Sequence, residues 1–314
     1  MKSVLITGVA GFLGSHLAEH YLKKGYRVVG LDNFSTGSHE NIEYLQQSSE
    51  FQFCEKDVCS DFKTWPEASG LEFVFHFASP ASPPHYQKLS IETLWANTKG
   101  LEQALFYADQ HSARLIFAST SEVYGDPNVS PQPESYWGHV NSFGERSCYD
   151  EAKRFGEALI FSHNRRHTSG HGLVRIFNTY GPRMNPNDGR VVINFIQQAL
   201  KNEPLTIYGD GNQTRSFCYV DDLISGITQY ADSNYQSPVN LGNDTENSML
   251  ELANVVLQVS RSQSILNHLP LPIDDPKKRR PDLSLAYAVL PNWKPKVPLA
   301  EGVLYMIEHF KNRI

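Results

Sequence analysis

Apolar residues in the first part of the chain alternate between short continuous runs and longer stretches with a helical period. The runs SVLITG, YRVVGLD, FQFCEKDV, FVFHFA, RLIFAS and GLVRIF are rich in β-branched and aromatic residues, which predicts buried strands. Between them, stretches such as SHLAEHYLKKG and ETLWANTKGLEQALFYADQ carry apolar residues at helical spacing and predict helices. This alternation predicts an α/β fold with a doubly wound parallel sheet of the Rossmann type.

The pattern loosens after residue 177. The remaining stretches predict helices at VVINFIQQALKN, SMLELANVVLQVS and LAEGVLYMIEHFKN, strands at PLTIYGDG and PVNLG, and a strand that runs into a helix at SFCYVDDLISGI. No linker or repeat separates the two parts. We therefore expect a nucleotide-binding domain of residues 1–177 with a returning segment at about 215–243, and a smaller interwoven α/β substrate domain of residues 178–214 and 244–314.

The first predicted strand leads directly into Gly8, Gly11 and Gly14, ahead of a helix. Glycines at this spacing permit a tight turn and let the backbone approach a pyrophosphate at the helix N-terminus. The alternative is a glycine turn that serves only to pack the strand on the helix. The second strand ends at Asp32, whose carboxylate can accept hydrogen bonds from a ribose and would repel a 2′-phosphate, which favours NAD over NADP.

Thr120, Ser121 and Glu122 follow the fifth predicted strand, and about thirty residues later Tyr149 and Lys153 stand four apart. On a helix this spacing places both side chains on one face. A lysine ammonium near a tyrosine hydroxyl favours the phenolate, so the tyrosine can act as a base near neutral pH. Because tyrosine and lysine at this spacing are common on solvated helices, the prediction depends on the nearby glycine motif and strand ends.

Composition narrows the class of protein further. The chain has 314 residues and a formal net charge of −6, which gives no reason to expect nucleic-acid binding. No apolar run approaches the roughly 20 residues that cross a bilayer, and glycines interrupt the apolar N-terminus, which argues against a signal peptide. The four cysteines lack metal or redox spacing, so we expect reduced thiols and a cytoplasmic protein.

Three histidines, His163, His167 and His171, recur at helical spacing, a pattern that also occurs in metal sites. Gly170 interrupts the helix before the third histidine. We therefore predict a solvated helix end that binds no metal ion.

With these stretches assembled, the chain resembles the extended short-chain dehydrogenase/reductase family from end to end, and within it the UDP-glucuronate decarboxylases (UDP-xylose synthases). TGVAGFLGSHL, CYDEAKR and RIFNTYGPRM fit the whole family, whereas HFASPASPPHY, ASTSEVYGDP and DDPKKRRPDL are more specific to the decarboxylases. Two departures stand out: Val9 takes the place of a glycine, and Glu92 and Trp95 take the places of lysines.

The resemblance implies NAD-dependent conversion of UDP-glucuronate to UDP-xylose. Tyr149, assisted by Lys153 and Thr120, would remove the proton of the sugar C4 hydroxyl while a hydride passes to NAD⁺. The 4-ketone would then accept the electrons that remain when the C5 carboxylate leaves as carbon dioxide. Reduction of C4 by the bound NADH would close the cycle. Ser121 and Glu122 are assigned to the decarboxylation half, although Glu122 could instead merely cap a turn.

The same tyrosine, lysine and NAD also serve other enzymes. The alternatives are a sugar-nucleotide 4-epimerase, a 4,6-dehydratase, or a decarboxylase that releases the 4-keto pentose. An epimerase needs no acidic group at Glu122, and a dehydratase usually carries an Asp-Glu pair where this chain has Ser121 and Glu122. The resemblance also implies a homodimer formed through two long helices at about 90–110 and 146–166.

Arg279, in the basic run Lys277–Arg280, matches the family arginine that reaches the sugar nucleotide. A guanidinium there could hold a phosphate or the substrate carboxylate. The competing interpretations are a solvated charge run and a nuclear-localisation-like cluster. Asp274, Asp275 and Asp282 flank the run and argue against the second.

The resemblance implies the remaining site residues by position. The NAD-binding residues are Gly8, Gly11, Phe12, Leu13, Gly14, Asp32, Asn33, Thr36, Gly37, Asp57, Val58, Ala78, Ser79, Asn97, Ser119, Tyr149 and Lys153. The residues that bind the UDP-sugar are Pro84, Tyr86, Asn178, Arg183, Val191, Tyr208, Gln213, Arg215 and Arg279.

Overall fold

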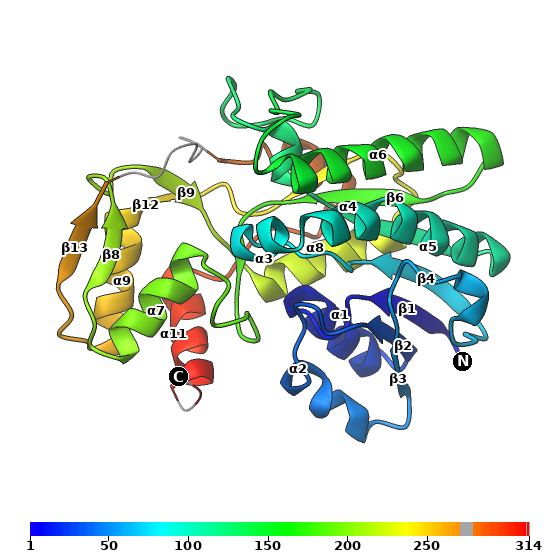
Figure 1. Cartoon of the computed structure of the whole chain (residues 1–314), viewed down its shortest axis with the longest axis horizontal. Coiled ribbons are helices and arrows are strands. Elements are labelled where there is room, and N and C mark those ends of the chain that lie inside the picture. The colour runs from blue at the N-terminus through cyan, green and yellow to red at the C-terminus, as the bar shows by residue number, and fades with distance from the viewer. Residues whose placement is uncertain (271–278, 312, 314) are drawn as a thin grey trace.

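A parallel sheet forms the centre of the protein (Figure 1). A computed structural model describes residues 1–270, 279–311 and 313, and in these residues the sheet has seven strands in the order β11-β6-β5-β4-β1-β2-β3. The strands are β1 (Ser3–Thr7), β2 (Arg27–Asp32), β3 (Phe51–Glu55), β4 (Leu71–His76), β5 (Arg114–Thr120), β6 (Gly172–Ile176) and β11 (Val239–Leu241). The predicted doubly wound sheet is confirmed. Its strand order reverses beside β1, where such sheets bind ligands.

Successive side chains of each strand enter two different cores, because neighbouring residues of a strand point to opposite faces. Val4 and Ile6 of β1 pack in the larger cluster with helices α1 (Phe12–Lys23) and α8 (Val220–Asp232). Leu5 packs on the other face with α5 (Lys99–Gln110) and α6 (Ser147–His167). Burial on both faces explains why these strands are almost continuously apolar.

One predicted helix is broken in the structure. The stretch expected as a single helix forms α4 (Ser90–Asn97) and α5, separated at Thr98. The carbonyl oxygen of Ala96 lies 3.0 Å from Nε2 of the buried His76, and the Thr98 hydroxyl donates to the carbonyl of Leu94. A Cβ on Gly100 would lie 2.7 Å from Val58 Cγ1. At the break, the Ala96 carbonyl can meet His76 of the sheet. Just after it, the absence of a side chain at Gly100 lets α5 lie close to Val58.

The second part of the chain lies beside the sheet, at the left of Figure 1. Its main elements are α7 (Val191–Leu200), β8 (Leu205–Tyr208), α9 (Met249–Ser260), β13 (Leu266–Leu269) and α11 (Leu299–Phe310). The strands β8 and β13 pair in parallel, and α9 packs against α7 and α11. Shorter elements join this part to the sheet: α3 (Pro83–Lys88), η3 (Ser121–Tyr124), β7 (Thr179–Tyr180), β9 (Thr214–Ser216), β10 (Cys218–Tyr219), β12 (Glu246–Ser248) and α10 (Ser284–Val289).

The remaining elements lie near the first three strands or cross the surface: α2 (Glu40–Glu43), η1 (Leu45–Gln47) and η2 (Phe62–Thr64). In the described part of the chain, none of the helices combines the length and the apolar character that crossing a membrane requires.

Candidate active site

The glycine loop between β1 and α1 leaves room that side chains would fill. Gly8 has a φ of +74°, which favours glycine, and a Cβ there would lie 2.8 Å from the Ala78 backbone. A Cβ on Gly14 would lie 2.1 Å from the carbonyl oxygen of Gly8. Helix α1 starts after Gly11 without a side-chain cap and has no acidic residue in its first turn. Its first backbone N–H groups, at Phe12 and Leu13, are therefore available to an anion such as a pyrophosphate.

Asp32 lies at the end of β2 and is buried. Its carboxylate accepts hydrogen bonds from the backbone N–H groups of Ala10, at 2.9 Å, and Phe34, at 2.8 Å. These two contacts fix the carboxylate beside the glycine loop, and each oxygen keeps a lone pair for another donor. The geometry fits the ribose contact expected of an NAD-binding aspartate.

Other residues predicted to bind NAD line the same sheet edge. Asn33 donates to Asp57 Oδ2 at 3.0 Å. Asn97 is fully buried and donates to Ser79 Oγ at 2.8 Å, while its own Oδ1 has no hydrogen-bond partner among the described residues. An unpaired buried amide oxygen indicates a donor from outside the protein. Ser119 donates instead to Glu157 at 2.5 Å. The positions of Thr36, Gly37 and Val58 complete this set, with Gly37 packed against Ala10 and Val58 buried.

Tyr149 and Lys153 lie on the first turns of α6, and both side chains are buried. The Lys153 ammonium donates to the carbonyl of Ala118 at 2.7 Å and lies 5.6 Å from the centre of the Tyr149 ring. Thr120, at the end of β5, is close enough to Tyr149 to act on the pKa of its hydroxyl. The structure therefore brings the three residues together at the carboxyl end of β5.

Burial acts against the charges that the sequence pattern suggests. Burial raises the pKa of Tyr149 above its ordinary value, while the hydrogen bond from Thr120 and the charge of Arg190 act to lower it. Burial also lowers the pKa of Lys153 to about 7. Burial thus opposes the phenolate form of Tyr149, and the effect of Lys153 on it stays a prediction. Further positive charge at the site would lower the pKa of Tyr149 and favour its phenolate form.

Tyr86 of α3 stacks on Tyr149, with ring centres 5.0 Å apart and planes 6° from parallel. Its hydroxyl is buried and has no hydrogen-bond partner among the described residues. Pro84, two residues earlier, lies close to the loop before α7: a Cβ on Gly189 would be 2.9 Å from Pro84 Cγ. Tyr86 therefore forms one wall of the site and leaves a donor open for a ligand.

Glu122 lies on η3, directly after β5. One carboxylate oxygen contacts the guanidinium of Arg279 and the other that of Arg146. The alternative that Glu122 only caps the turn does not hold, because the Thr120 side chain accepts the bond from the Glu122 N–H and forms the cap. Ser121, next to it, is buried. Glu122 is thus held in the site by two cations.

Arg279 is buried, so it is not part of a solvated charge run. Lys277, Asp274 and Asp275 lie outside the described residues. Burial lowers the pKa of Arg279 to about 10, which still leaves it charged at neutral pH. Its backbone forms a bridge with that of Arg215, so both predicted anion partners lie on adjacent segments. Among the described residues, Arg279 Nε has no hydrogen-bond partner.

Arg183, predicted to bind the UDP-sugar, makes its contacts with α1 and the segment after β2. Its backbone has a φ of +68°, and its guanidinium binds Glu19 and His16 of α1 and Tyr44. The Arg183 side chain therefore joins the loop after β7 to α1, because Glu19 on that helix provides the anion. The two residues are 164 positions apart in the sequence. This cluster lines a separate cleft of about 580 Å³.

The remaining residues predicted to bind the UDP-sugar lie along the second part of the chain. Tyr208 ends β8 with its side chain half exposed, and Gln213 donates to its carbonyl at 2.7 Å. Asn178 accepts a backbone hydrogen bond from Cys218, and Val191 begins α7. They are separate in sequence, and their contact with the UDP-sugar stays a prediction.

Sequence reasoning missed three charged residues near Tyr149. Arg146 contacts Glu122, and Arg190 contributes a positive charge that lowers the Tyr149 pKa. Asp150, next to Tyr149, is buried, and burial raises its pKa to about 7. The helical period would have placed Arg146 and Asp150 four apart on one face. No periodicity, however, indicates which face of an N-terminal helical turn meets a distant loop.

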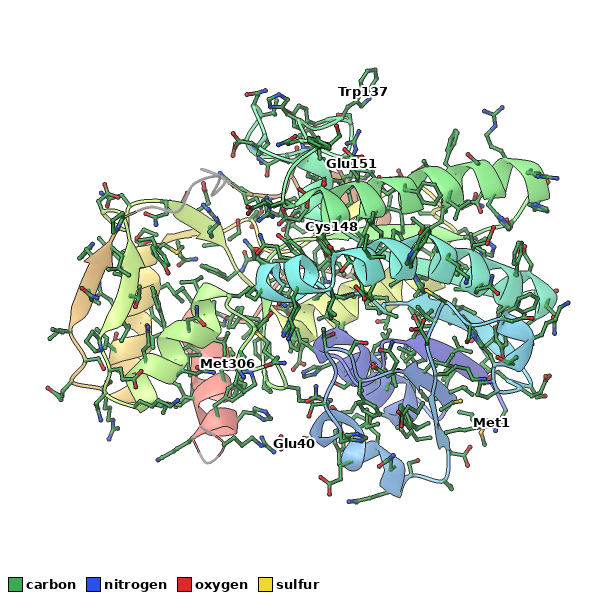
Figure 2. The ribbon with its side chains drawn as sticks, viewed as in Figure 1. Met1, Glu40, Trp137, Cys148, Glu151 and Met306 are labelled. Atoms are coloured by element: carbon green, nitrogen blue, oxygen red, sulfur yellow. The ribbon has the colours of Figure 1, made fainter. Side chains whose placement is uncertain are left out.

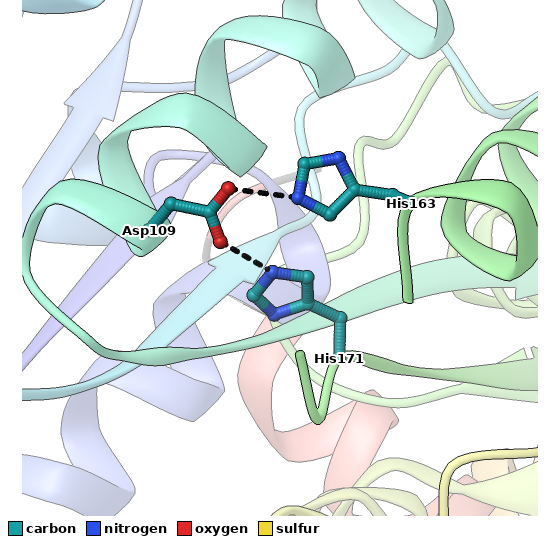
Figure 3. Close-up of side chains that lie close together, drawn as sticks. All are labelled: Asp109, His163 and His171. Carbon is teal, nitrogen blue, oxygen red and sulfur yellow. Dashed lines mark hydrogen bonds and ion pairs between the residues drawn. The ribbon is translucent and has the colours of Figure 1, made fainter. Parts of the chain in front are cut away.

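The expectation of a solvated helix end at the histidines was wrong. Figure 3 shows His163 and His171 pointing to the two carboxylate oxygens of Asp109, at 2.8 and 3.1 Å. Their side chains are 8% and 2% exposed. Nδ1 of His171 accepts a hydrogen bond from the Leu115 N–H, so its proton resides on Nε2 and is directed at Asp109. A metal ion on Nε2 of the neutral ring would require the ring proton on Nδ1, facing the Leu115 N–H, so we expect no metal ion here; the hydrogen bonds join α5, α6 and the residue before β6.

The segment before α6 leads from the surface into the site. Trp137 projects outward and is 89% exposed, whereas Cys148 points inward beside Tyr149 (Figure 2). The thiol of Cys148 contacts the carbonyl of Tyr86 at 3.5 Å. The start of α6 is therefore anchored on the wall that Tyr86 forms.

Comparison with known proteins agrees with this geometry. A sequence profile of the NAD dependent epimerase/dehydratase family matches residues 4–242. UDP-glucuronic acid decarboxylase 1 of Danio rerio is 46% identical over 313 residues, which cover 100% of this chain and 73% of the relative. UDP-glucuronic acid decarboxylase 1 of Arabidopsis thaliana is 45% identical, over 99% of this chain and 70% of the relative.

Solved structures show the same fold. The UDP-glucose 4-epimerase of Thermotoga maritima superposes with a TM-score of 0.89 at 27% identity, with 99% of each chain covered. The UDP-glucuronic acid 4-epimerase of Bacillus cereus, in complex with UDP-glucuronic acid and NAD, superposes with a TM-score of 0.87 at 29% identity over 99% of both chains.

The chain belongs to the NAD dependent epimerase/dehydratase family, the extended short-chain dehydrogenases/reductases, and its cofactor is NAD. The glycine loop, the fixed carboxylate of Asp32 and the unpaired Asn97 oxygen fit that cofactor. Among its relatives, the curated proteins with 43–46% identity over essentially the whole chain are UDP-glucuronic acid decarboxylases.

Proposed function

We propose that this protein is an NAD-dependent UDP-glucuronate decarboxylase, a carboxy-lyase that forms UDP-xylose and carbon dioxide through a UDP-4-keto sugar. The observation that carries the proposal is the ion pair between Glu122, directly after β5, and the buried Arg279. A substrate carboxylate needs a desolvated guanidinium to bind it, and Arg279 has a donor nitrogen without a partner among the described residues.

Tyr149 is the proposed base for the C4 hydroxyl. Two neighbours assist Tyr149 in taking up the proton: the Thr120 hydroxyl, which acts to lower the pKa of the phenol, and Lys153, whose amine lies near the Tyr149 ring. NAD⁺, when bound, accepts the C4 hydride, adds a positive charge, and returns the hydride at the end of the cycle. The buried ring of Tyr86 against Tyr149 keeps the phenol in one orientation and excludes water from it.

The decarboxylation half is assigned to Ser121, Glu122 and Arg279. Once C4 is a ketone, the bond from C5 to the carboxylate breaks and its electron pair moves onto the C4 oxygen. A proton then adds at C5. Arg279 binds the carboxylate while it is charged, and Glu122 raises the energy of a second carboxylate at close range, which favours its loss as neutral carbon dioxide.

The main rival is a 4-epimerase, since a structural relative at 29% identity epimerises UDP-glucuronic acid. If this chain were a 4-epimerase, it would use the same Tyr149 and Lys153. The decarboxylase interpretation is better supported, because the relatives of that name share 43–46% identity over essentially the whole chain. A 4,6-dehydratase and a decarboxylase that releases the 4-keto pentose would also use Tyr149 and Lys153, and each is distinguished from the proposed enzyme by its product.

We also propose how the chain divides its tasks. Residues 1–177, with the returning segment at about 215–243, bind NAD, and residues 178–214 and 244–314 bind the sugar nucleotide. A homodimer through α4, α5 and α6 is supported by apolar side chains left exposed there, among them Ile91 at 58%, Trp95 at 55% and Phe155 at 50%. A cytoplasmic location is supported by the four cysteines, which are free thiols.

The test is NMR of the product formed from UDP-glucuronate, with carbon dioxide measured in the same sample. We expect UDP-xylose and carbon dioxide in equal amounts, with the cofactor oxidised at the end. UDP-glucose serves as the matched control, because it lacks the carboxylate and can yield no carbon dioxide. Formation of UDP-galacturonate without carbon dioxide would instead establish the epimerase, and a UDP-4-keto pentose with reduced cofactor would establish the enzyme that releases its intermediate.

A further inference from the structure

Four charged side chains form a chain between η3 and the start of α6. Arg279 contacts one oxygen of Glu122, and Arg146 contacts the other. Arg146 Nε lies 3.8 Å from a carboxylate oxygen of Asp150. The side chains of Arg279, Glu122 and Asp150 are 8%, 14% and 7% exposed, and that of Arg146 is 29% exposed. The order along the chain is therefore cation, anion, cation, anion.

The position of Arg146 is unfavourable for the helix itself. Arg146 is the N-cap residue of α6, and its side chain makes no capping hydrogen bond. A positive charge at this end of a helix is repelled by the helix dipole. The Arg146 side chain therefore does not stabilise the start of α6, where only the backbone carbonyl of Arg146 accepts hydrogen bonds, and its contacts with Glu122 and Asp150 account for its position.

Aromatic contacts fix the Arg146 guanidinium from a third direction. Its central carbon lies 5.9 Å from the centre of the Tyr86 ring. Tyr86 in turn stacks on Tyr149, the proposed base. Arg146 thus contacts the decarboxylation residue directly and lies against the ring that stacks on the base, and its positive charge also acts on Tyr149.

The substrate changes the charge balance at this place. This step rests on the proposed function: a sugar carboxylate that binds Arg279 brings a second anion next to Glu122. At short range, in a largely buried site, two carboxylates with one cation between them repel each other. A second cation on Glu122 keeps it in place and leaves Arg279 able to receive the substrate carboxylate.

We propose that Arg146 is a positioning residue for the decarboxylation step, which holds Glu122 in place while Arg279 binds the substrate carboxylate. The ion pairs of its side chain are with Glu122 and Asp150, so we expect its main effect in the carboxylate half of the site. The inference predicts a requirement for Arg146 that depends on the carboxylate of the substrate.

The first test compares affinities for UDP-glucuronate and UDP-glucose by isothermal titration calorimetry of the NAD-loaded enzyme. Arg146→Gln should weaken UDP-glucuronate binding by about 10-fold, the result of losing one close cation, and leave UDP-glucose binding within about twofold. Arg146→Lys should restore part of the difference. Arg165→Gln, an exposed arginine on the same helix, is the matched control and should change neither affinity.

The second test is a double-mutant cycle of Arg146→Gln and Glu122→Gln, followed by single-turnover kinetics. Each variant should slow carbon dioxide release by about 100-fold, as a misplaced catalytic group does, and slow cofactor reduction by less than about 10-fold. The double variant should be no slower than either single variant, because both remove the same interaction.

Two results would overturn the inference. One is an Arg146→Gln variant that weakens both UDP-sugars equally, or neither, because a carboxylate-dependent role requires the difference. The other is additive effects of the two substitutions, which would make Arg146 independent of Glu122. A wild-type enzyme that binds UDP-glucuronate but releases no carbon dioxide would reject the proposed function alone, since the affinity comparison still decides the role of Arg146.

Discussion

Two arginine–carboxylate pairs, Arg175–Glu157 and Arg279–Glu122, have side chains no more than 15% exposed, and they differ in how completely their donors are used. Arg175 of β6 binds Glu157 of α6 through two nitrogens, at 2.9 and 2.7 Å, and its third nitrogen donates to the Tyr124 hydroxyl and the Glu134 carbonyl. Burial alone would lower the Arg175 pKa, but the bonds and charge of Glu157 raise it. This pair satisfies itself within the protein.

The Arg279–Glu122 pair is different. Arg279 contacts Glu122 through one nitrogen, its Nε has no partner among the described residues, and burial lowers its pKa to about 10. Glu122 is shared with a second cation, Arg146. An ion pair whose donors are all used stabilises the fold, whereas one with an open donor and a shared anion is suited to exchange partners with a ligand.

The largest expected effect contrasts the tyrosines of the two pairs. Tyr149→Phe removes the proposed base, so carbon dioxide release should fall by about 1,000-fold or more. Tyr124→Phe removes the hydrogen bonds that the Tyr124 hydroxyl makes with Arg175 and Asn240, so it should lower the free energy of unfolding by ~1–2 kcal/mol while the folded enzyme keeps its rate. Single-turnover kinetics and urea unfolding of both variants measure this; a Tyr149→Phe enzyme with more than about a tenth of the wild-type rate would contradict the role of the base.

The carboxylates sharpen the same contrast. Glu157→Gln leaves Arg175 buried without its counter-ion and should cost ~3 kcal/mol of stability, with little change in the rate of the folded enzyme. Glu122→Gln should do the opposite and slow carbon dioxide release by about 100-fold, at less than half that stability cost, because Arg146, one of the two arginines that contact Glu122, is 29% exposed. Equal stability losses in the two variants would show that both pairs are structural.

Lys153 gives a prediction on pH. Burial lowers its pKa from 10.5 to about 7, so between these values the unfolded chain binds a proton that the folded protein lacks. Stability therefore rises with pH across this window. Lys153→Met removes this contribution and should be more stable than wild type at neutral pH by roughly 2–4 kcal/mol, with the gain shrinking toward about pH 10. Urea unfolding at several pH values measures it; a gain that does not depend on pH would point to packing instead.

The smallest effect concerns the cluster of Asp109, His163 and His171, where His163 lies at the other end of α6 from Tyr149. His163→Gln removes one contact with Asp109 and should lower the free energy of unfolding by less than ~1 kcal/mol, because Asp109 is a third exposed. The rate of carbon dioxide release should not change. Added zinc should not raise the melting temperature of the wild type, because the Nε2 proton of His171 is directed at Asp109; a rise lost in His163→Gln would reverse this conclusion.

The sheet and the cofactor loop could be read from local patterns. Continuous apolar runs predicted six of the strands, since burial on both faces leaves no polar period. The glycines before α1 and Asp32 at the end of β2 are fixed by backbone needs within a few residues of each, so spacing alone located them. The break at Thr98 escaped prediction, because it depends on His76 and Val58 from other elements.

Charged partners were the least predictable feature. Arg183 was expected to bind the substrate but is bound to Glu19 on α1, and His163 and His171 were expected in solvent but are held by Asp109. Arg146 and Asp150 were passed over, although they flank Tyr149. The sequence does not show which oppositely charged side chain each of these residues meets in the fold. That partner can be distant: Arg183 and Glu19 are 164 positions apart.

The sequence by itself determined the parallel sheet, the NAD-binding loop and the presence of a tyrosine and a lysine on one helical face, because each follows from hydrophobic periodicity or backbone geometry over short distances. The tertiary structure alone decided the charge of the site: which arginines surround Glu122, and that burial raises the pKa of Tyr149 and lowers that of Lys153. The reason is that desolvation and ion pairing depend on segments brought together only by folding, which leave no local pattern in the chain.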